Sequence, residues 1–428
     1  MSRPASPDRA PDRATDAPGV VAIRDAVRAG RASARAAVEA CLARIAARDG
    51  AVRAFVEVRA EAALAAAAAG PAGPLAGVPF AVKDVLDVAG LPTRMGSRAG
   101  DPRPAARDAG CVGLARLAGA IPLGKTVTAE FAGTQPTPVL NPRATSRTPG
   151  GSSSGSAAAV ADGMVPLAFG TQTGGSVLRP AAFCGIVGFK PSFGLYPVAG
   201  MKPAAHSFDT VGILTRSVAD AAAAHAALVS EAEAEPAQAP TLGLFASHLQ
   251  ETVAPQTQAA FDAALSRLSA AGARIVPVAP PPGFERITAH RATINAYERA
   301  RDLAGEWRAA RDDLSPETLA VCERGFAISA PDYLAAREAV DAFRERCAGL
   351  FSGVDALVTP TTPGPAPEGH AWAGDPRLQE LWTMLHLPSL SLPMPADAPA
   401  PLGLQLIGPR YRDRGLLSTA LWAEAALA

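Results

Sequence analysis

The sequence predicts a single α/β domain in which a central sheet is covered by helices on both faces. Strand-like segments such as residues 77–88 and 165–171 are almost wholly apolar, which is typical of strands buried on both faces. Helical segments separate these strands along most of the chain. No linker rich in glycine, serine or proline divides the sequence, and it contains no internal repeat. We therefore expect one large α/β/α layered domain over residues 19–428, with a mixed, mostly parallel sheet.

The first half of the chain shows the alternation of helices and strands most clearly. Ser33 is placed to cap the second helix, because a serine hydroxyl accepts a hydrogen bond from the free backbone N–H groups of the first turn. Residues 1–18, rich in proline, aspartate and arginine, are expected to form a disordered tail. The expected helices cover 20–30, 33–50, 111–120 and 156–163, and the expected strands cover 54–58, 77–88, 121–127 and 165–171.

The second half continues the pattern but contains a long helical stretch at residues 286–352. Three helices are expected there, interrupted at Pro316 and Pro331, because proline is tolerated only in the first turn of a helix. This stretch is expected to form a variable lobe or cap over the sheet. Elsewhere, helices are expected at 217–229, 255–271 and 415–427, and strands at 241–246, 273–279, 355–362, 387–395 and 401–408.

The composition favours a cytoplasmic enzyme that acts on a small molecule. The 40 Lys and Arg residues balance the 40 Asp and Glu residues, so no basic field is available to attract nucleic acid or an anionic membrane. The five cysteines are widely spaced, which is typical of reduced core thiols. The sequence has no signal peptide, membrane span, HExxH motif or Cys/His cluster, so we expect neither a metal nor another cofactor.

A run of serines and glycines at residues 148–163 raises three interpretations. Gly151–Gly155 satisfies the G-x-S-x-G pattern of a nucleophile elbow, but a turn-rich loop precedes it where that motif needs a strand. A phosphate-binding loop would need a lysine that the run lacks. The third interpretation is a serine-rich loop that only caps the following helix.

A second cluster at residues 170–180 favours a catalytic role over a simple helix cap, because Ser176 also follows two glycines at the start of a helix. One helix and one strand separate the clusters, which can bring both loops to the same edge of the sheet. A serine nucleophile needs a base. No histidine is close in sequence, whereas Lys83 lies in an apolar run where burial would favour its neutral amine. Alternatively, Lys83 ends its strand at the surface or pairs with Asp84.

The segment 150–194 resembles the signature segment of the amidase signature family, whose members are serine hydrolases with a Ser, cis-Ser, Lys triad. The similarity also covers residues 74–97, 207–220, 355–363, 385–393 and 401–413, and therefore most of the chain. The resemblance implies that Ser176 is the nucleophile, Ser152 the cis-serine and Lys83 the base. Ser176 follows Ser152 by 24 residues, in agreement with the family spacing.

The same resemblance implies an acyl-enzyme mechanism for amide hydrolysis. Lys83 would take a proton from Ser176 through Ser152, while Ser176 attacks the amide carbonyl. The backbone N–H groups of Thr173, Gly174, Gly175 and Ser176 would bind the oxyanion. Ser153 and Ser154 are expected to hydrogen-bond behind the reacting groups.

Two departures from the usual family pattern bear on the substrate. In many family members an arginine stands two residues after the nucleophile, but here Leu178 occupies that place and Arg179 follows it. Four residues before the nucleophile, this chain has Gln172 where aspartate is common. Both features resemble the malonamidase branch, in which an arginine at this offset recognises a carboxylate. Arg179 is thus the candidate substrate-binding residue, with a structural ion pair as the alternative. Lys202 is a further candidate cation near the site.

Two other functions remain open alongside a stand-alone amidase. One is the glutaminase-type subunit of a tRNA-dependent amidotransferase, which shares the triad and works with partner subunits. The other is a catalytically silent family member that acts as a binding protein. The resemblance also implies a homodimer.

Overall fold

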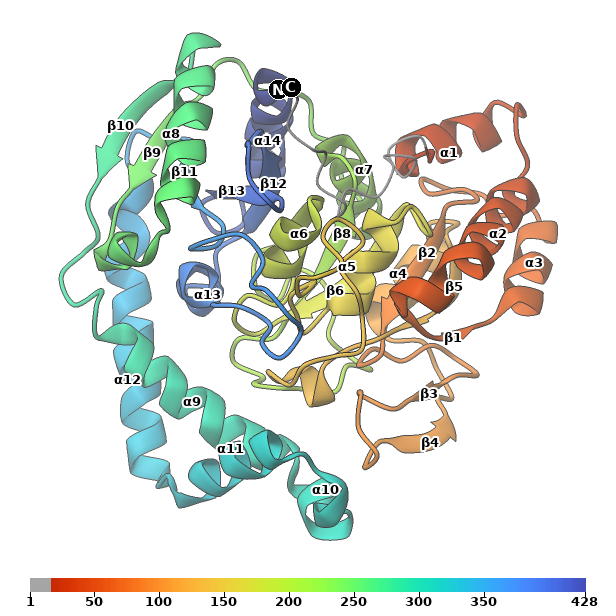
Figure 1. Ribbon diagram of the computed structural model, residues 1–428, viewed down its shortest axis with the longest axis horizontal. Helices are drawn as coiled ribbons and strands as arrows, with labels where there is room; N and C mark the ends of the chain where they lie inside the picture. The colour runs from red at the N-terminus through yellow and green to blue at the C-terminus, as the bar shows by residue number, and fades with distance from the viewer. Residues whose placement is uncertain (1–16) are drawn as a thin grey trace, which may run out of the picture.

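The computed structural model describes residues 17–428, which form a layered α/β structure around one 11-stranded sheet (Figure 1). The sheet order is β1-β5-β2-β6-β8-β7-β12-β13-β11-β9-β10, and β3 and β4 form a separate two-stranded sheet. The strands are β1 (Phe55–Val58), β2 (Pro79–Lys83), β3 (Pro92–Thr93), β4 (Asp101–Pro104), β5 (Ile121–Thr126), β6 (Leu167–Gln172), β7 (Val187–Lys190), β8 (Thr210–Thr215), β9 (Thr241–Phe245), β10 (Arg274–Val278), β11 (Ala356–Pro360), β12 (Ser389–Met394) and β13 (Leu402–Ile407).

The layered architecture is confirmed, but the expectation of a mostly parallel sheet is wrong. Parallel pairing occurs between β5, β2 and β6 and between β11, β9 and β10. The strands between these groups pair antiparallel, from β6 through β8, β7, β12 and β13 to β11. Parallel neighbours need a long crossover, usually a helix. The chain from β7 to β8 and from β12 to β13 returns without a helix, so these pairs are antiparallel.

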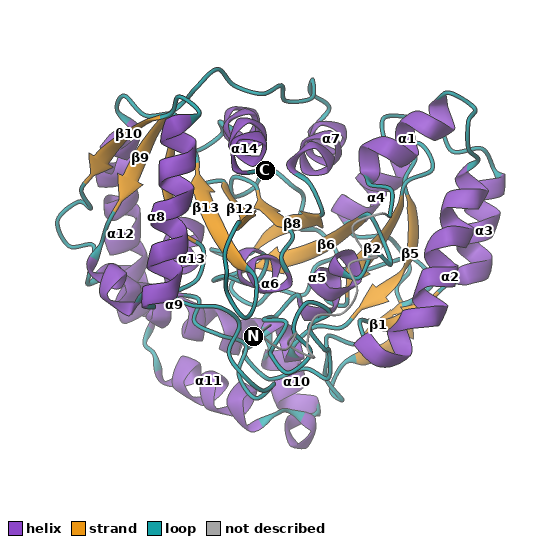
Figure 2. Cartoon of the chain, turned by 45° about the horizontal axis from the view of Figure 1, so that its top comes forward, coloured by secondary structure: helices purple, strands orange, loops and turns teal. Residues whose placement is uncertain are grey.

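Helices cover both faces of the sheet. In Figure 2, α7 and α14 lie on one side of the sheet and α5 and α6 on the other. The helices are α1 (Val20–Arg28), α2 (Ala34–Val52), α3 (Ala60–Ala68), α4 (Gly110–Leu117), α5 (Ser154–Ala161), α6 (Leu178–Cys184), α7 (Val218–Val229), α8 (Pro255–Ala270), α9 (Ile287–Asp302), α10 (Ala304–Ala309), α11 (Pro316–Ala327), α12 (Ala330–Arg346), α13 (Arg377–Met384) and α14 (Asp413–Leu427).

Each helical layer has its own apolar core. Side chains of α1, α4, α7, α8 and α14 pack against one face of the sheet, and side chains of α2, α3, α5 and α6 pack against the other. A third cluster joins α9, α12 and α13. Burial of apolar surface on both faces explains why the strands lack polar alternation.

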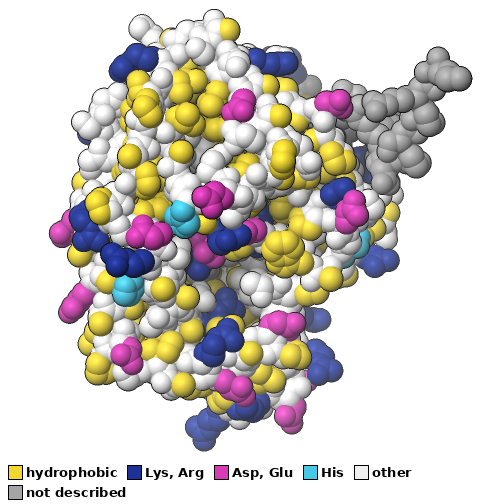
Figure 3. All heavy atoms as spheres, turned by 60° about the vertical axis from the view of Figure 1, so that its left-hand side comes forward, with side chains coloured by type: hydrophobic (Ala, Val, Ile, Leu, Met, Phe, Trp, Pro, Cys, Tyr) yellow, Lys and Arg dark blue, Asp and Glu magenta, His cyan; other side chains and the backbone are white. Residues whose placement is uncertain are grey.

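Residues 286–352 form a helical lobe, as expected, which extends beyond the sheet in Figure 1. The Ser315 and Ser329 hydroxyls accept hydrogen bonds from the Thr318 and Asp332 N–H groups and so cap α11 and α12. Both helices begin with a proline in the first turn. On the face shown in Figure 3, basic, acidic and apolar side chains are interspersed without a large region of one charge.

The N-terminal region and the cysteines can be compared with what the sequence predicts for them. Residues 1–16 of the expected tail lie outside the described residues, whereas the carbonyls of Ala17 and Pro18 accept hydrogen bonds from Arg216. Ser33 caps α2 by accepting from the Ala36 N–H. All five cysteines are buried and free. In residues 17–428, no helix is long and apolar enough to cross a membrane.

Candidate active site

The site forms where β2 and β6, neighbours in the parallel part of the sheet, end at the same edge. Their register places Val82 opposite Phe169, so Lys83 at the end of β2 lies close to the last residues of β6. The Lys83 Nζ is 2.8 Å from the Thr171 Oγ1 and 3.4 Å from the Thr171 carbonyl oxygen. The loops that follow these two strands therefore meet at this edge.

Lys83 is fully buried and does not pair with the adjacent Asp84. Its Nζ lies 2.8 Å from the Oγ of Ser152. Burial lowers the pKa of Lys83 to about 7, with Arg299 and Arg179 acting in the same direction and Asp209 opposing them. A substantial fraction of this amine is therefore neutral near neutral pH.

A depressed lysine pKa alone does not identify a base, because burial also lowers the pKa of Lys190 to about 7. The Lys190 Nζ donates to the carbonyls of Pro191 and Leu387 at 3.0 and 2.6 Å, and Lys190 does not line the cavity described below. Only Lys83 combines the low pKa with a serine hydroxyl as neighbour within residues 17–428.

The two serine-containing loops are joined by hydrogen bonds beside Ser152. The Ser153 N–H donates to the Ser176 carbonyl at 3.3 Å, and the Ser153 Oγ exchanges hydrogen bonds with the backbone of Thr171. The Ser154 Oγ accepts from the Thr137 hydroxyl. The Gly151–Ser152 peptide bond is cis, as the family resemblance implied. Ser153 and Ser154 therefore support the loops, which agrees with the sequence-based expectation.

A glycine is required at the entrance to this loop. Gly150 has a φ of +79°, and a Cβ there would lie 3.0 Å from the Cα of Pro180 in α6. A larger residue would clash with α6 and occupy an unfavourable backbone region. The close contact brings the loop that carries Ser152 against the helix that follows Ser176.

The loop from Thr173 to Ser176 is held by side chains around it. The Gln172 Oε1 accepts hydrogen bonds from the N–H groups of Val177 and Leu178, and its Nε2 donates to the Thr383 Oγ1 at 2.9 Å. The Thr383 hydroxyl in turn donates to the Gly174 carbonyl at 2.8 Å. Gln172 thus links the start of α6 to α13.

The backbone N–H groups of this loop are available to a ligand. Within residues 17–428, the N–H groups of Gly174, Gly175 and Ser176 have no hydrogen-bond acceptor. The Thr173 hydroxyl donates to Asp209, whose other oxygen accepts from the Ala204 and Ala205 N–H groups. Fixed, unpaired N–H groups of this kind can bind an oxyanion.

Ser176 lines a cavity of about 200 Å³ between the sheet edge and the helical lobe. Its walls come from three regions: the loops before α5 and α6, the helices α9 and α11, and the segment that leads into α13. The lining side chains with charge or hydrogen-bonding groups are Thr134, Gln135, Thr173, Ser176, Arg179, Arg291, Asn295, Arg299, Glu317, Thr318, Trp372 and Glu380.

Arg179 lies in this cavity but is partly committed to the protein. Its Nη1 and Nη2 donate to the carbonyls of Gly374 and Gly151 at 2.6 and 2.7 Å, while its Nε is buried without a partner. Burial lowers the pKa of Arg179 to about 10. The structural alternative raised from the sequence, an ion pair, is not found, because no carboxylate within residues 17–428 forms a salt bridge with Arg179.

The structure does not bring Lys202 into the cavity. The Lys202 Nζ donates to the Asp302 carbonyl and to Glu306 at 2.9 and 2.7 Å, which neutralises its charge within the lobe. Sequence reasoning missed the residues that α9 and α13 contribute to the cavity. For α9 a signal was present, since Arg291, Asn295 and Arg299 are spaced by four residues and share one helix face.

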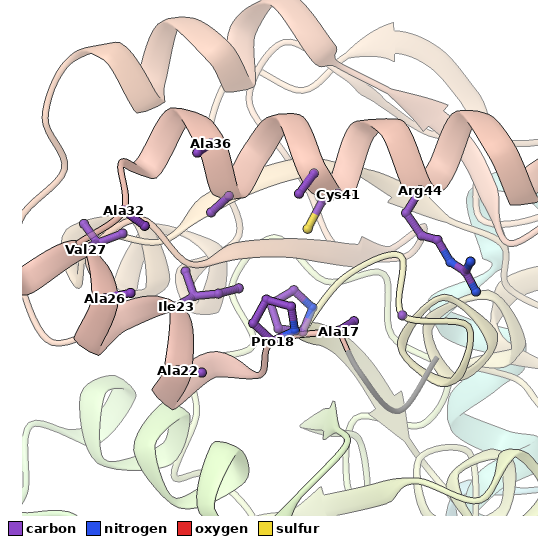
Figure 4. Close-up of a pocket in the computed structure, with 14 residues that line it drawn as sticks. Ala17, Pro18, Ala22, Ile23, Ala26, Val27, Ala32, Ala36, Cys41 and Arg44 are labelled. Atoms are coloured by element: carbon purple, nitrogen blue, oxygen red, sulfur yellow. The ribbon is translucent and has the colours of Figure 1, made fainter. Parts of the chain in front are cut away.

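A second, larger cavity of about 500 Å³ lies between α1 and α2 (Figure 4). Its walls are mostly alanine, with Ile23, Val27 and Cys41, and Arg44 is its single charged side chain within the described residues. Burial raises the pKa of Cys41 to about 12, so this thiol is not nucleophilic. The larger cavity therefore lacks reactive groups.

Comparison with known proteins assigns the whole arrangement to one family. The family model described as Amidase matches residues 36–417. The chain is 34% identical over 394 residues to 2-amino-5-chloromuconic acid deaminase of Comamonas testosteroni, covering 83% of this chain and 82% of that protein. It is 32% identical to a glutamyl-tRNA(Gln) amidotransferase subunit of Koribacter versatilis, covering 90% and 93% of the two chains. A crystal structure of an amidase superposes with a TM-score of 0.89 at 32% identity, covering 96% of this chain and all of the other.

Proposed function

The chain belongs to the amidase signature family, and we propose that it hydrolyses the C–N bond of a small amide through an acyl-enzyme on Ser176. The observation that carries this proposal is the fully buried Lys83, whose Nζ lies 2.8 Å from the Ser152 Oγ beside the loop of Ser176. A buried amine with a pKa of about 7 can accept a proton near neutral pH. The family membership makes the chain an amidohydrolase. We propose its substrate class and the roles of Lys83, Ser152 and Ser176.

In the first step, neutral Lys83 accepts the Ser152 hydroxyl proton, and Ser152 accepts the proton of Ser176. The Ser176 Oγ attacks the amide carbon, and the carbonyl π electrons move onto oxygen. This oxyanion is bound by the N–H groups of Thr173, Gly174, Gly175 and Ser176. Such donors contribute about 3 to 4 kcal/mol each to the transition state in other hydrolases.

In the second step, the C–N bond breaks and the amine leaves with a proton delivered by Ser152. Lys83 returns its proton to Ser152, so the triad is neutral again. Water then attacks the Ser176 ester and gives a proton to Ser152, which passes its own proton to neutral Lys83. As the ester C–O bond breaks and the carboxylic acid leaves, Lys83 returns the proton through Ser152 to the Ser176 oxygen. Thr171 supports this route, since its hydroxyl and carbonyl hold the Lys83 Nζ in position.

The cavity supports a small substrate with a carboxylate, such as malonamate. A volume of about 200 Å³ is below the range of about 300 to 1,000 Å³ that drug-sized ligands occupy. Arg179 contributes a buried positive charge that no salt bridge within residues 17–428 neutralises. We propose that this charge favours the entry of a substrate carboxylate into the cavity, without a direct hydrogen bond from its two terminal nitrogens.

A second candidate function is that of an amidotransferase component, because the relative from Koribacter versatilis has that name and matches over almost the full chain. The test uses the purified full-length chain with a panel of small primary amides and ammonia release as the readout. Turnover of a small amide without added partners supports the amidase. If glutamine is the one amide in the panel that releases ammonia, and only when partner subunits are added, the amidotransferase component would replace the stand-alone amidase.

We also propose that the protein is a cytoplasmic homodimer that uses no cofactor. The five buried, free cysteines support a reducing compartment. The homodimer rests on the family resemblance. Light scattering on the purified chain measures the mass directly, and a monomer would remove this part of the proposal.

A further inference from the structure

The active-site cavity contains a second buried guanidinium, Arg299, which comes from the helical lobe. Arg299 lies on α9 and is only 6% exposed. Its Nη1 donates to the Phe131 carbonyl at 3.1 Å. Its Nε and Nη2 have no hydrogen-bond partner within the described residues. Both nitrogens keep some solvent-accessible surface. These two donors are therefore open to the cavity that Arg299 lines.

No carboxylate of the described residues neutralises Arg299 directly. Asp209 and Glu130 act on it through space, but each already has its own hydrogen-bond donors. Asp209 accepts from Thr173 and two backbone N–H groups, and Glu130 accepts from Ser97, Ser315 and Thr318. Buried arginines are normally paired. An unpaired guanidinium in a substrate cavity indicates that its counter-charge arrives with the ligand.

The neighbouring side chains on the same helix face differ from Arg299. Arg291 is neutralised by Glu380, with 3.1 Å between Nη1 and Oε1, and it also donates to the Thr173 carbonyl. Asn295 lies one turn from both arginines, lines the cavity and makes no side-chain hydrogen bond within residues 17–428. This face of α9 therefore offers one free cation and one free amide to a ligand.

Arg299 is also better placed than Arg179 to bind a ligand. Both terminal nitrogens of Arg179 already donate to backbone carbonyls, and its Nε is sealed from the cavity. Arg299 uses one nitrogen for the protein and leaves the edge formed by Nε and Nη2 free. That edge is the one that binds a carboxylate through two parallel hydrogen bonds.

We propose that Arg299 binds the carboxylate of an anionic amide substrate, with Asn295 beside it, while Arg179 positions the Gly151 carbonyl next to Ser152. This inference rests on the proposed amidase function and assigns its substrate class. The substrate is an amide whose acyl group ends in a carboxylate, and the α9 face of the lobe selects it.

The test compares hydrolysis of malonamate with hydrolysis of its uncharged isostere isovaleramide. Wild-type enzyme is expected to have the lower KM for malonamate. Arg299→Gln should raise that KM by about tenfold or more, since hydrogen bonds to charged groups are worth about 1.5 to 3 kcal/mol. The KM for isovaleramide should change less than about twofold. Arg299→Lys, which keeps the charge, should restore part of the difference.

A matched control is Arg301→Gln on the same helix. Arg301 donates to the carbonyls of Tyr297 and Gly325 and does not line the cavity, so both KM values should stay unchanged. Equal losses on both amides in Arg299→Gln would assign Arg299 to positioning the Phe131 segment and overturn the proposal. Equal wild-type KM values for the two amides would overturn it as well.

A binding measurement separates this inference from the amidase function. Titration calorimetry of malonate into the full-length protein should give weaker binding for Arg299→Gln than for wild type and Arg301→Gln. If the protein hydrolyses isovaleramide as well as malonamate and does not bind malonate, only the assignment of the carboxylate site to Arg299 is wrong. Malonate binding that depends on Arg299 without hydrolysis of either amide would uphold the anion site and defeat the amidase.

Discussion

The pH dependence of activity follows from the pKa of Lys83. Burial holds this pKa at about 7, well below the ordinary value of 10.5, and the mechanism needs the neutral amine. The neutral fraction rises with pH through the folded-state pKa, so activity should rise as well. A group with a pKa of about 7 is about 9% neutral at pH 6 and about 90% neutral at pH 8. We expect kcat/KM for a neutral amide to rise about tenfold between these pH values.

The assay measures ammonia release from isovaleramide between pH 5.5 and 9 at constant ionic strength. This substrate does not titrate in the range, so the rise reports the free enzyme. The Lys83→Ala variant should lose about 10²- to 10⁴-fold in kcat and should lose the tenfold rise. A profile that is flat from pH 6 to 8, or that rises only near pH 10, would refute the role of a neutral buried lysine.

Three further substitutions test parts of the site. Ser152→Ala should reduce kcat by about 10²-fold or more while circular dichroism stays unchanged, because it removes the proton relay; wild-type turnover would remove Ser152 from the mechanism. Gln172→Glu loses the donor to Thr383 while keeping its size, and should lower kcat by about tenfold with little change in KM; a pure KM effect would contradict its role in holding the oxyanion loop. Lys125→Met leaves the Asp84 carboxyl buried without its partner at 2.8 Å and should cost about 3 to 5 kcal/mol in urea denaturation, whereas an unchanged midpoint would contradict it.

The layered fold could be predicted because the apolar strands and the helices between them are local features of the sequence. The direction of the central strands could not, since it depends on the connections. The extent of β2 was also predicted too long: the apolar run at 77–88 ends as a strand at Lys83. Beyond Lys83 the backbone turns, with the Val85 and Leu86 N–H groups donating to its carbonyl.

The loops of the site were predictable for a similar reason, because Ser152 and Ser176 lie in compact glycine-rich clusters. The cavity wall from the lobe was not, since more than a hundred residues separate Arg299 from Ser176 along the chain. The spacing of Arg291, Asn295 and Arg299 predicts that they share one helix face, but it does not show what that face lies against. Only the fold shows that Arg299 lines the same cavity as Ser176 and lacks a carboxylate partner within the described residues.

The most direct measurement is the site of covalent labelling by a fluorophosphonate, determined by peptide mapping and mass spectrometry. We expect one adduct, on Ser176, formed faster at pH 8 than at pH 6 and absent from Ser176→Ala. An adduct on another serine, or a folded wild-type protein that does not react at all, would contradict it.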